Sequence, residues 1–268
     1  MSLIEVRNIS FGYDHQALFQ NVGFQVDSGE ILCLIGPNGC GKTTLLDCLL
    51  GTIKPRTGQI FFRGEEINTF RPSDIAKHIA YVPQDHEKSF PYSVLDIVLM
   101  GRTPYTGMFS SPSLEDRRIA EEALDLLGLK RFKDRPYTQL SGGEGQLVML
   151  ARALAQKTPV IIMDEPTAHL DFKHELLIME TLVRLVRETG LSIIMATHFP
   201  NHAFYFENNN IATSVALMNE KTLTAVGPPR DILSEENIKA VYNINAKIVS
   251  CAIGDNDLKQ IIPLNTLS

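Results

Sequence analysis

A run of apolar residues that ends in a glycine-rich loop is the feature that most constrains the fold of this chain. Residues 31–35 read ILCLI, and such an uninterrupted run is typical of a strand buried on both faces of a parallel sheet. The loop that follows fits the pattern G-x-x-x-x-G-K-[ST], and the mostly apolar residues after it, 45–50, indicate a helix. A strand, a glycine loop and a helix in this order predict an α/β protein with an anion-binding loop.

The loop contains the residue types that a bound triphosphate needs. Glycines let backbone N–H groups face an anion, and the helix that starts near Gly41 or Lys42 adds the positive end of its dipole. Lys42 would neutralise charge on the β- and γ-phosphates, and the Thr43 hydroxyl would bind Mg²⁺. We therefore predict that the triphosphate binds at Gly36, Pro37, Asn38, Gly39, Cys40, Gly41, Lys42, Thr43 and Thr44.

Two carboxylates follow a second apolar run. Residues 160–163 (VIIM) predict another buried strand, and Asp164 stands at its carboxyl end, where ligands gather in parallel α/β sheets. A carboxylate there would hold Mg²⁺ through a water molecule. Glu165 would project differently and polarise an attacking water as a general base. Together with the glycine loop, the pair predicts hydrolysis of the bound triphosphate.

A second helix start with adjacent glycines is expected at residues 140–146 (LSGGEGQ). Ser141 and Glu144 have the spacing of a capping box, and Gly142 and Gly143 would again expose backbone N–H groups to an anion. At these residues the chain resembles the ATP-binding cassette (ABC) ATPases, and the resemblance extends over nearly its whole length. The segment is similar to the family's signature motif, which contacts the γ-phosphate held by the partner subunit.

Further motifs of that family occur in the same order. Tyr13 resembles the aromatic residue that stacks on adenine, and Gln84 resembles the glutamine that touches Mg²⁺ and links the two lobes. Asp171 is similar to the aspartate that pairs across the dimer, and His198 to the switch histidine near the γ-phosphate. The resemblance implies ATP and Mg²⁺ as cofactors and a head-to-tail homodimer with two composite ATP sites. It implies catalytic roles for Lys42, Gln84, Glu165 and His198, a metal site at Thr43, Gln84 and Asp164, and nucleotide contacts from Ser141, Gly142, Gly143 and Asp171.

The chain departs from the family pattern at two positions. Gly145 stands where the family often has Arg or Gln, and a glycine in the first turn of a helix costs about 1 kcal/mol relative to Ala. Ala168 replaces a frequent Ser, with little expected consequence. Ser141, Gly142 and Gly143 are intact.

The resemblance implies the fold class and its subdivision. The expected fold is an α/β P-loop NTPase (RecA-like) core with an antiparallel β subdomain and an inserted helical subdomain, which is the ABC ATPase fold. Residues 1–268 are expected to form a single ABC ATPase domain. Within it, residues 1–85 and 157–226 would form the core with the antiparallel β subdomain, 86–156 the helical lobe with the signature motif, and 227–268 a C-terminal extension.

Hydrophobic patterning predicts several further elements. A helix covers 172–189 and ends at Gly190, and an apolar run at 191–196 predicts the next parallel strand. A small hairpin is expected from 215–218 and 223–226. The extension is expected to hold a helix at 233–242 and a last strand near 247–251.

Composition excludes several classes of protein. With 25 Lys and Arg against 31 Asp and Glu, the net charge of −6 argues against nucleic acid as a partner. No window approaches about 18 uninterrupted apolar residues, and the first residues lack the pattern of a secretory signal, so we expect a cytoplasmic protein without membrane spans. The four cysteines, Cys33, Cys40, Cys48 and Cys251, form no CxxC pair and are expected to be reduced thiols.

Four segments resemble one class of ABC ATPase. Residues 93–105, 135–137, 166–171 and 227–242 are similar to importer subunits for iron-siderophores, haem and cobalamin, called type II. The resemblance implies a permease dimer, indirect action with a substrate-binding protein, and a peripheral location on the cytoplasmic face of the cell (inner) membrane. The cargo stays open among iron chelate, haem, cobalamin and an oxyanion such as molybdate.

Other ABC ATPases remain as alternatives. A cassette of DNA repair or chromosome maintenance would need a long coiled coil between Lys42 and Ser141, and no heptad pattern is present there. A translation-associated protein would usually carry two cassettes, and 268 residues permit one. An exporter ATPase stays open, because the permease decides between export and import.

Overall fold

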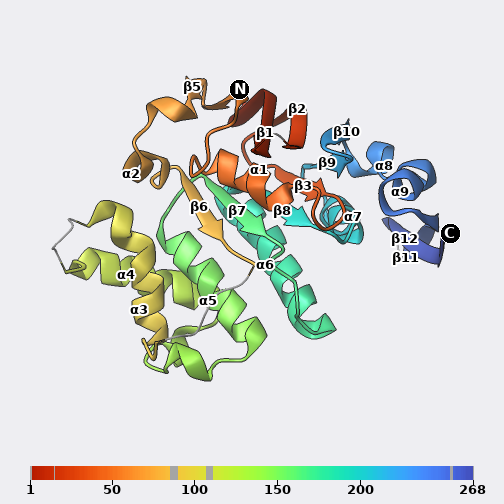
Figure 1. The fold of residues 1–268 in the computed structure, drawn as a ribbon. Helices are drawn as coiled ribbons and strands as arrows, with labels where there is room; N and C mark the ends of the chain where they lie inside the picture. The colour runs from red at the N-terminus through yellow and green to blue at the C-terminus, as the bar shows by residue number, and fades with distance from the viewer. Residues whose placement is uncertain (1, 15, 85–89, 107–110, 254–255, 268) are drawn as a thin grey trace. The chain divides into compact units, whose positions relative to one another are not determined.

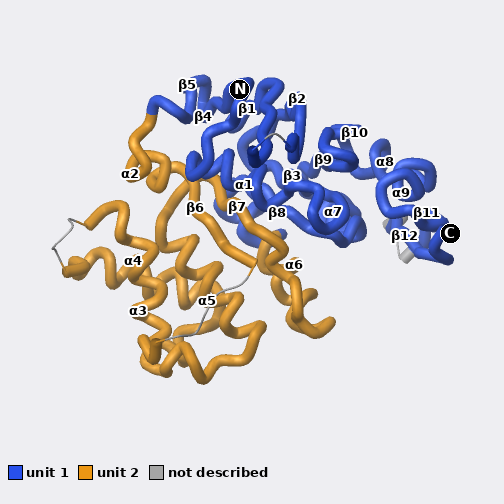
Figure 2. The backbone as a smooth tube through the Cα atoms, viewed as in Figure 1, with its two compact units in different colours: residues 1–69, 183–268 blue, residues 70–182 orange. Residues whose placement is uncertain are grey.

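The computed structural model describes residues 2–14, 16–84, 90–106, 111–253 and 256–267. The chain divides into two compact units, residues 1–69 with 183–268 and residues 70–182 (Figure 2). Each unit is described by itself below. No helix of the described residues is long and apolar enough to cross a membrane.

An antiparallel sheet begins the first unit. Its strand order is β2-β1-β4-β5, and Ile4 and Val6 of β1 are buried in alternation, with the next buried residue, Ile9, after a register shift. This alternation is the pattern of a sheet with one covered face. The elements are β1 (Ile4–Tyr13), β2 (Gln16–Val26), β4 (Thr57–Phe62), β5 (Glu65–Glu66) and η1 (Ile67–Thr69).

A parallel arrangement around β3 forms the centre of the first unit (Figure 1). All five residues of β3 (Ile31–Ile35) are buried, as the apolar run predicts, and β3 pairs in parallel with β8 and β9. The predicted hairpin is confirmed, because β9 pairs antiparallel with β10. The other elements are β8 (Ser192–Thr197), β9 (Thr213–Asn219), β10 (Thr222–Gly227), α1 (Lys42–Leu49) and α7 (Asn201–Asn208).

The C-terminal extension of the first unit differs from the sequence prediction in two ways. The expected helix at 233–242 begins later, at Glu235, because Ser234 caps its first turn by accepting the Asn237 N–H. The single strand expected near 247–251 is wrong in extent, because that segment is half of a two-stranded hairpin. The elements are α8 (Pro229–Ile232), α9 (Glu235–Tyr242), β11 (Ile244–Ile253) and β12 (Asn256–Thr266).

The second unit combines a parallel strand pair with a group of helices. β6 (Ile79–Val82) pairs in parallel with β7 (Val160–Asp164), and α3, α4 and α5 pack against one another (Figure 1). The predicted helix at 172–189 is confirmed as α6, whose N-terminal part belongs to this unit. The remaining elements are α2 (Pro72–Ile75), α3 (Val94–Leu99), η2 (Met100–Tyr105), α4 (Leu114–Leu126), η3 (Lys130–Phe132), η4 (Tyr137–Gln139), α5 (Gly142–Ala155) and α6 (Phe172–Thr189).

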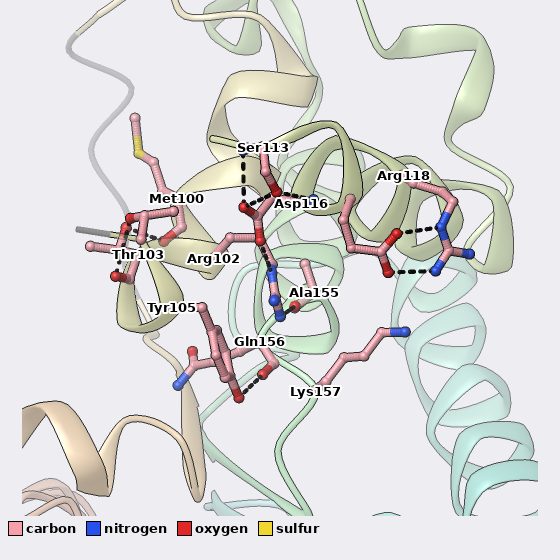
Figure 3. A network of polar contacts seen from close by, with 12 residues as sticks. Met100, Arg102, Thr103, Tyr105, Ser113, Asp116, Arg118, Ala155, Gln156 and Lys157 are labelled. Carbon is pink, nitrogen blue, oxygen red and sulfur yellow. Dashed lines mark hydrogen bonds and ion pairs between the residues drawn. The ribbon is translucent and has the colours of Figure 1, made fainter. Parts of the chain in front are cut away.

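One buried ion pair ties the helices of the second unit together (Figure 3). Arg102 of η2 donates from Nε to Asp116 at 2.9 Å and from Nη1 to the Ala155 carbonyl at the end of α5, also at 2.9 Å. Asp116 in turn forms a capping box with Ser113 at the start of α4. Arg102 therefore joins the beginning of α4 to the end of α5.

The predicted subdivision into core, helical lobe and extension stays a prediction. The two compact units divide the chain at residues 69/70 and 182/183, which are not the predicted boundaries. Helices α3, α4 and α5 all lie between residues 86 and 156. Residues 86–89, where the lobe is expected to begin, lie outside the described residues.

Candidate functional site

The glycine loop of the first unit has the geometry of an anion-binding turn. α1 begins at Lys42, and its N-cap is Gly41, with a φ of 103° and no side chain that caps the helix. The Lys42 side chain is buried, and its Nζ donates to the carbonyls of Gly36 at 2.8 Å and Pro37 at 3.1 Å. The cation is thus held at the loop, beside the helix start where a phosphate group is favoured.

Close packing explains two of the loop glycines. A Cβ at Gly36 would lie 2.5 Å from the Met218 carbonyl oxygen and 2.8 Å from the Cys40 sulfur, so no larger residue fits without a shift of the backbone. Gly41 combines a left-handed φ with the Leu18 side chain of β2, 3.1 Å from where its Cβ would be. The antiparallel sheet therefore packs directly against the loop.

His198 lies at the strand end next to this loop. Ile35 and Thr197 are in register in the neighbouring parallel strands β3 and β8, so Gly36 and His198 follow them at adjacent strand ends. The His198 ring packs against the Phe199 ring in a tilted arrangement, with 3.9 Å between ring centroids. The structure thus brings two of the predicted site segments together within the first unit.

Tyr13 lies at the end of β1 on the antiparallel sheet. Its side chain is 58% exposed and packs edge-to-face on Phe11, with 5.2 Å between the ring centroids. An exposed ring held by a second ring is available for stacking on a flat ligand.

The second unit places Gln84 and the predicted carboxylates Asp164 and Glu165 at the ends of neighbouring strands. Val82 and Met163 are in register in β6 and β7, and Gln84 and Asp164 follow them closely along the chain. Asp164 is only 3% exposed. Glu165 adopts a left-handed backbone with a φ of 43°, an uncommon conformation for a glutamate and one that recurs at functional sites.

The predicted capping box at the second glycine-rich helix start is confirmed. Ser141 is the N-cap of α5, its Oγ accepts the Glu144 N–H at 3.2 Å, and the Glu144 carboxylate accepts the Ser141 N–H at 2.9 Å. These bonds lower the pKa of Glu144, with the Ser141 N–H as the largest cause. Gly145, the departure from the family pattern, is buried within the same turn region of α5.

Asp171 and the glycine-rich start of α5 are linked by His174. Asp171 precedes α6 and accepts the backbone N–H of His174 at 2.9 Å and its ring Nδ1 at 2.8 Å. The same imidazole covers Gly143, since a Cβ there would lie 2.3 Å from His174 Cδ2. These bonds lower the pKa of Asp171.

Sequence reasoning missed this role of His174. In the sequence, the pair His169 and His174 is only a weak candidate for a metal site. The bond to Asp171 has a local signal in the sequence. An Asp directly before the first residue of a helix is typical of an N-cap, whose side chain accepts the backbone N–H three residues later, here that of His174. Its contact with Gly143, by contrast, joins two helices and carries no local signal.

The family model for ABC transporters matches residues 19–168 of the chain. The molybdate import ATP-binding protein MolC of Haemophilus influenzae is 36% identical over 90% of this chain and 88% of its own length. The iron(3+)-hydroxamate import ATP-binding protein FhuC of Bacillus subtilis is 34% identical over 93% of this chain and 91% of its own length.

Solved structures give the same result. A putative metal-chelate type ABC transporter in an inward-facing conformation matches with a TM-score of 0.86 and 34% identity, covering 98% of this chain and 97% of that chain. A dimeric ATP-binding cassette in a post-hydrolysis state with bound ADP and Pi matches with a TM-score of 0.70 and 27% identity, covering 85% and 99% of the two chains.

The fold and its glycine loop define the α/β P-loop ATPase class of the ABC cassettes. The chain belongs to the ABC transporter family and is an ATPase of that family. Among the similar cassettes, one is a dimer with bound ADP and Pi, and another, cbiO1 of Clostridium perfringens, is part of an ABC transporter complex. The predicted fold class is therefore confirmed.

Proposed function

We propose that this chain is the ATP-hydrolysing subunit of an importer that takes up a metal chelate, or a related substrate such as molybdate, through a separate permease. The observation that carries the proposal is similarity along almost the whole chain to proteins of that kind. Both import subunits named above match 90% or more of the chain, and the metal-chelate transporter covers 98% of it.

The first unit supplies the phosphate-binding part of the proposed ATP site. The loop of residues 36–44 would surround the β- and γ-phosphates with backbone N–H groups, and Lys42 would move its Nζ from the Gly36 and Pro37 carbonyls to those phosphates. Tyr13 would stack on the adenine. His198, at the strand end next to the loop, would contact the γ-phosphate.

The residues proposed to hold Mg²⁺ offer the ligands that this ion prefers. Thr43 contributes a hydroxyl, Gln84 an amide oxygen and Asp164 a carboxylate, and hard oxygen donors with few carboxylates are typical of magnesium bound together with phosphates. When bound, the ion would neutralise charge on the phosphates. Asp164, at the carboxyl end of β7, would hold it through a water molecule.

Glu165 is the proposed general base. Its carboxylate would take a proton from a water molecule as the water oxygen attacks the γ-phosphorus and the bond to the β-phosphate oxygen breaks, leaving ADP and phosphate. In a head-to-tail dimer, Ser141, Gly142 and Gly143 of one subunit would bind the γ-phosphate held by the other. Asp171 would pair across the same interface.

The proposed partners follow from this role. Two copies of the chain would work with a permease dimer and, through it, with a substrate-binding protein. The chain would lie on the cytoplasmic face of the inner membrane as a peripheral subunit.

Trapping the ATP-bound dimer tests the assignment of Glu165. The variant Glu165→Gln is expected to dimerise on addition of ATP and Mg²⁺, as measured by light scattering after gel filtration, because it binds ATP without hydrolysing it. The double variant Lys42→Ala/Glu165→Gln is the control and should stay monomeric. A monomeric Glu165→Gln variant under the same conditions would show that the assignment is wrong.

Transport through a reconstituted complex tests the cargo class. The chain is combined in proteoliposomes with the permease encoded beside it, and uptake of ferric hydroxamate and of molybdate is measured with ATP on the side of the ATPase. ATP-dependent uptake of either supports the proposal. Export of either, or ATPase activity that no permease changes, contradicts it.

A further inference from the structure

The C-terminal extension contacts the segment that carries His198. Asn201 is the first residue of α7, three positions after His198, and its side chain forms two hydrogen bonds to Ile261 of β12. The Asn201 Nδ2 donates to the Ile261 carbonyl at 3.1 Å, and the Ile261 N–H donates to Asn201 Oδ1 at 2.8 Å.

This pairing is specific to a carboxamide. An asparagine side chain carries one acceptor and one donor, as a peptide group does, and can therefore satisfy both the N–H and the C=O of one strand residue. Ile261 is 6% exposed, so its backbone groups lie where an unpaired polar atom is costly. Asn201 thus fixes the start of α7 to β12.

A second part of the extension reaches the same segment. Tyr242, the last residue of α9, donates its hydroxyl to the backbone carbonyl of His198 at 3.3 Å. The hairpin is in turn tied to α9, because Lys247 of β11 pairs with Glu235 of that helix at 2.9 Å. Helix α9 and strand β12 therefore both bond to the segment of residues 198–201, α9 at His198 and β12 at Asn201.

Contacts within residues 197–202 also order the segment around His198. Thr197 Oγ accepts the Phe199 N–H at 3.1 Å and lies 3.0 Å from Nδ1 of the buried His202. The His198 ring packs against the Phe199 ring. These contacts order the backbone on both sides of His198. The bonds of Tyr242 and Asn201 then determine the position of this segment relative to the C-terminal extension.

We propose that Asn201 and Tyr242 are positioning residues for ATP hydrolysis, which act by holding His198 in its working place from the C-terminal extension. The inference rests on the proposed function, because it takes His198 to contact the γ-phosphate. A group misplaced by about 1 Å can cost on the order of 10²-fold in rate, so small shifts of this segment are sufficient. The extension is then part of the catalytic apparatus.

Steady-state kinetics on the full-length chain tests the proposal. Asn201→Ala and Tyr242→Phe are each expected to lower kcat for ATP about fivefold or more, while KM for ATP stays within about twofold, because ATP binding at the glycine loop is untouched. Asn208→Ala is the matched control. Asn208 also lies on α7 and donates to a β12 carbonyl, that of Lys259 at 3.4 Å, but at the other end of the helix.

The outcomes separate positioning from mere attachment of the hairpin. Normal kcat in Asn201→Ala and Tyr242→Phe overturns the proposal. An equal loss of kcat in Asn208→Ala overturns it too, because any loosening of the hairpin would then be enough to slow hydrolysis. A rise in KM for ATP in place of a fall in kcat also overturns it. Tyr242→Phe removes a single oxygen atom and one hydrogen bond, so its melting temperature, followed by circular dichroism, should stay within about 5 °C of that of the unchanged chain.

His198→Ala in the same assay distinguishes failure of this inference from failure of the proposed function. If His198→Ala abolishes turnover and the two positioning variants do not lower it, the inference alone is wrong. If His198→Ala leaves turnover intact, the proposed role of His198 is wrong, and the inference falls with it.

Discussion

The ring Nδ1 of His174 lies 2.8 Å from the Oδ1 of Asp171, and the same imidazole covers Gly143 at the start of α5. One side chain therefore connects the residue that precedes α6 with the glycine-rich start of α5. Both places are proposed to contact the second subunit of an ATP-bound dimer. Their relative position depends on this histidine.

Removing the imidazole should therefore weaken the dimer. In the Glu165→Gln background, His174→Ala is expected to raise the dimer dissociation constant with ATP and Mg²⁺ about tenfold, because it loses both the bond to Asp171 and the contact with Gly143. The constant is measured by sedimentation velocity. ATP binding to the monomer should not change, since the glycine loop of residues 36–44 is untouched.

A conservative variant distinguishes the hydrogen bond from simple bulk. His174→Asn places an amide donor near the position of Nδ1 and should restore most of the dimer affinity, whereas His174→Leu keeps an apolar contact without the donor and should not. If the leucine variant dimerises as well as the asparagine variant, the bond to Asp171 has no role in dimerisation.

The two glycines at the start of α5 should differ in their tolerance of a methyl group. A Cβ at Gly143 would lie 2.3 Å from His174 Cδ2, whereas no atom lies within 4 Å of a Cβ at Gly142. Gly143→Ala is expected to destabilise the fold by about 1–3 kcal/mol through overpacking, and Gly142→Ala to be neutral or stabilising by up to about 1 kcal/mol. Urea unfolding followed by circular dichroism measures both, since the chain has no tryptophan. Equal stability of the two variants would contradict the packing argument.

The parts of the site that sequence predicted are those with a local cause. The glycine loop lies between an apolar run and a helix, and the box of Ser141 and Glu144 depends on two residues three apart. Such features depend on neighbours along the chain, so their patterns can be read directly. The family resemblance added Tyr13, Gln84 and His198, which have no distinctive local pattern.

The parts that sequence did not predict depend on contacts between distant segments. The second strand of the C-terminal hairpin contains Pro263 next to a register shift, and proline within a run argues against a strand, so the pattern predicts only β11. Asn201 likewise gives no sign of its partner, because Ile261 comes to it only through the tertiary fold. The bonds of His174 to Asp171 were locally readable, but its contact with Gly143 was not.

The buried ion pair of the second unit should contribute far more to stability than an exposed pair on the same helix. Arg102→Met keeps the apolar stem but removes the bonds to Asp116 and to the Ala155 carbonyl, and is expected to cost about 3–5 kcal/mol. Arg118→Met breaks exposed pairs with Glu115 and Glu122 on α4 and should cost less than about 1 kcal/mol. Urea unfolding compares the two variants. Similar losses of unfolding free energy would show that the bonds of Arg102 to Asp116 and Ala155 contribute no more than an exposed ion pair.

Acid should remove the contribution of Asp116 over a defined range of pH. The bonds from Ser113 and then the Arg102 guanidinium lower the pKa of Asp116 to about 2 in the folded chain, from 3.8 without them. The folded state thus favours the charged carboxylate, so its stabilisation is complete above about pH 4 and is lost as the pH falls toward 2. Asp116→Asn cannot titrate and should be less stable than the unchanged chain at pH 7, with the difference in unfolding free energy closing between about pH 4 and 2. Urea unfolding at a series of pH values measures that difference, and a difference that stays constant down to about pH 2 would show that Asp116 is not held in its charged form by these contacts.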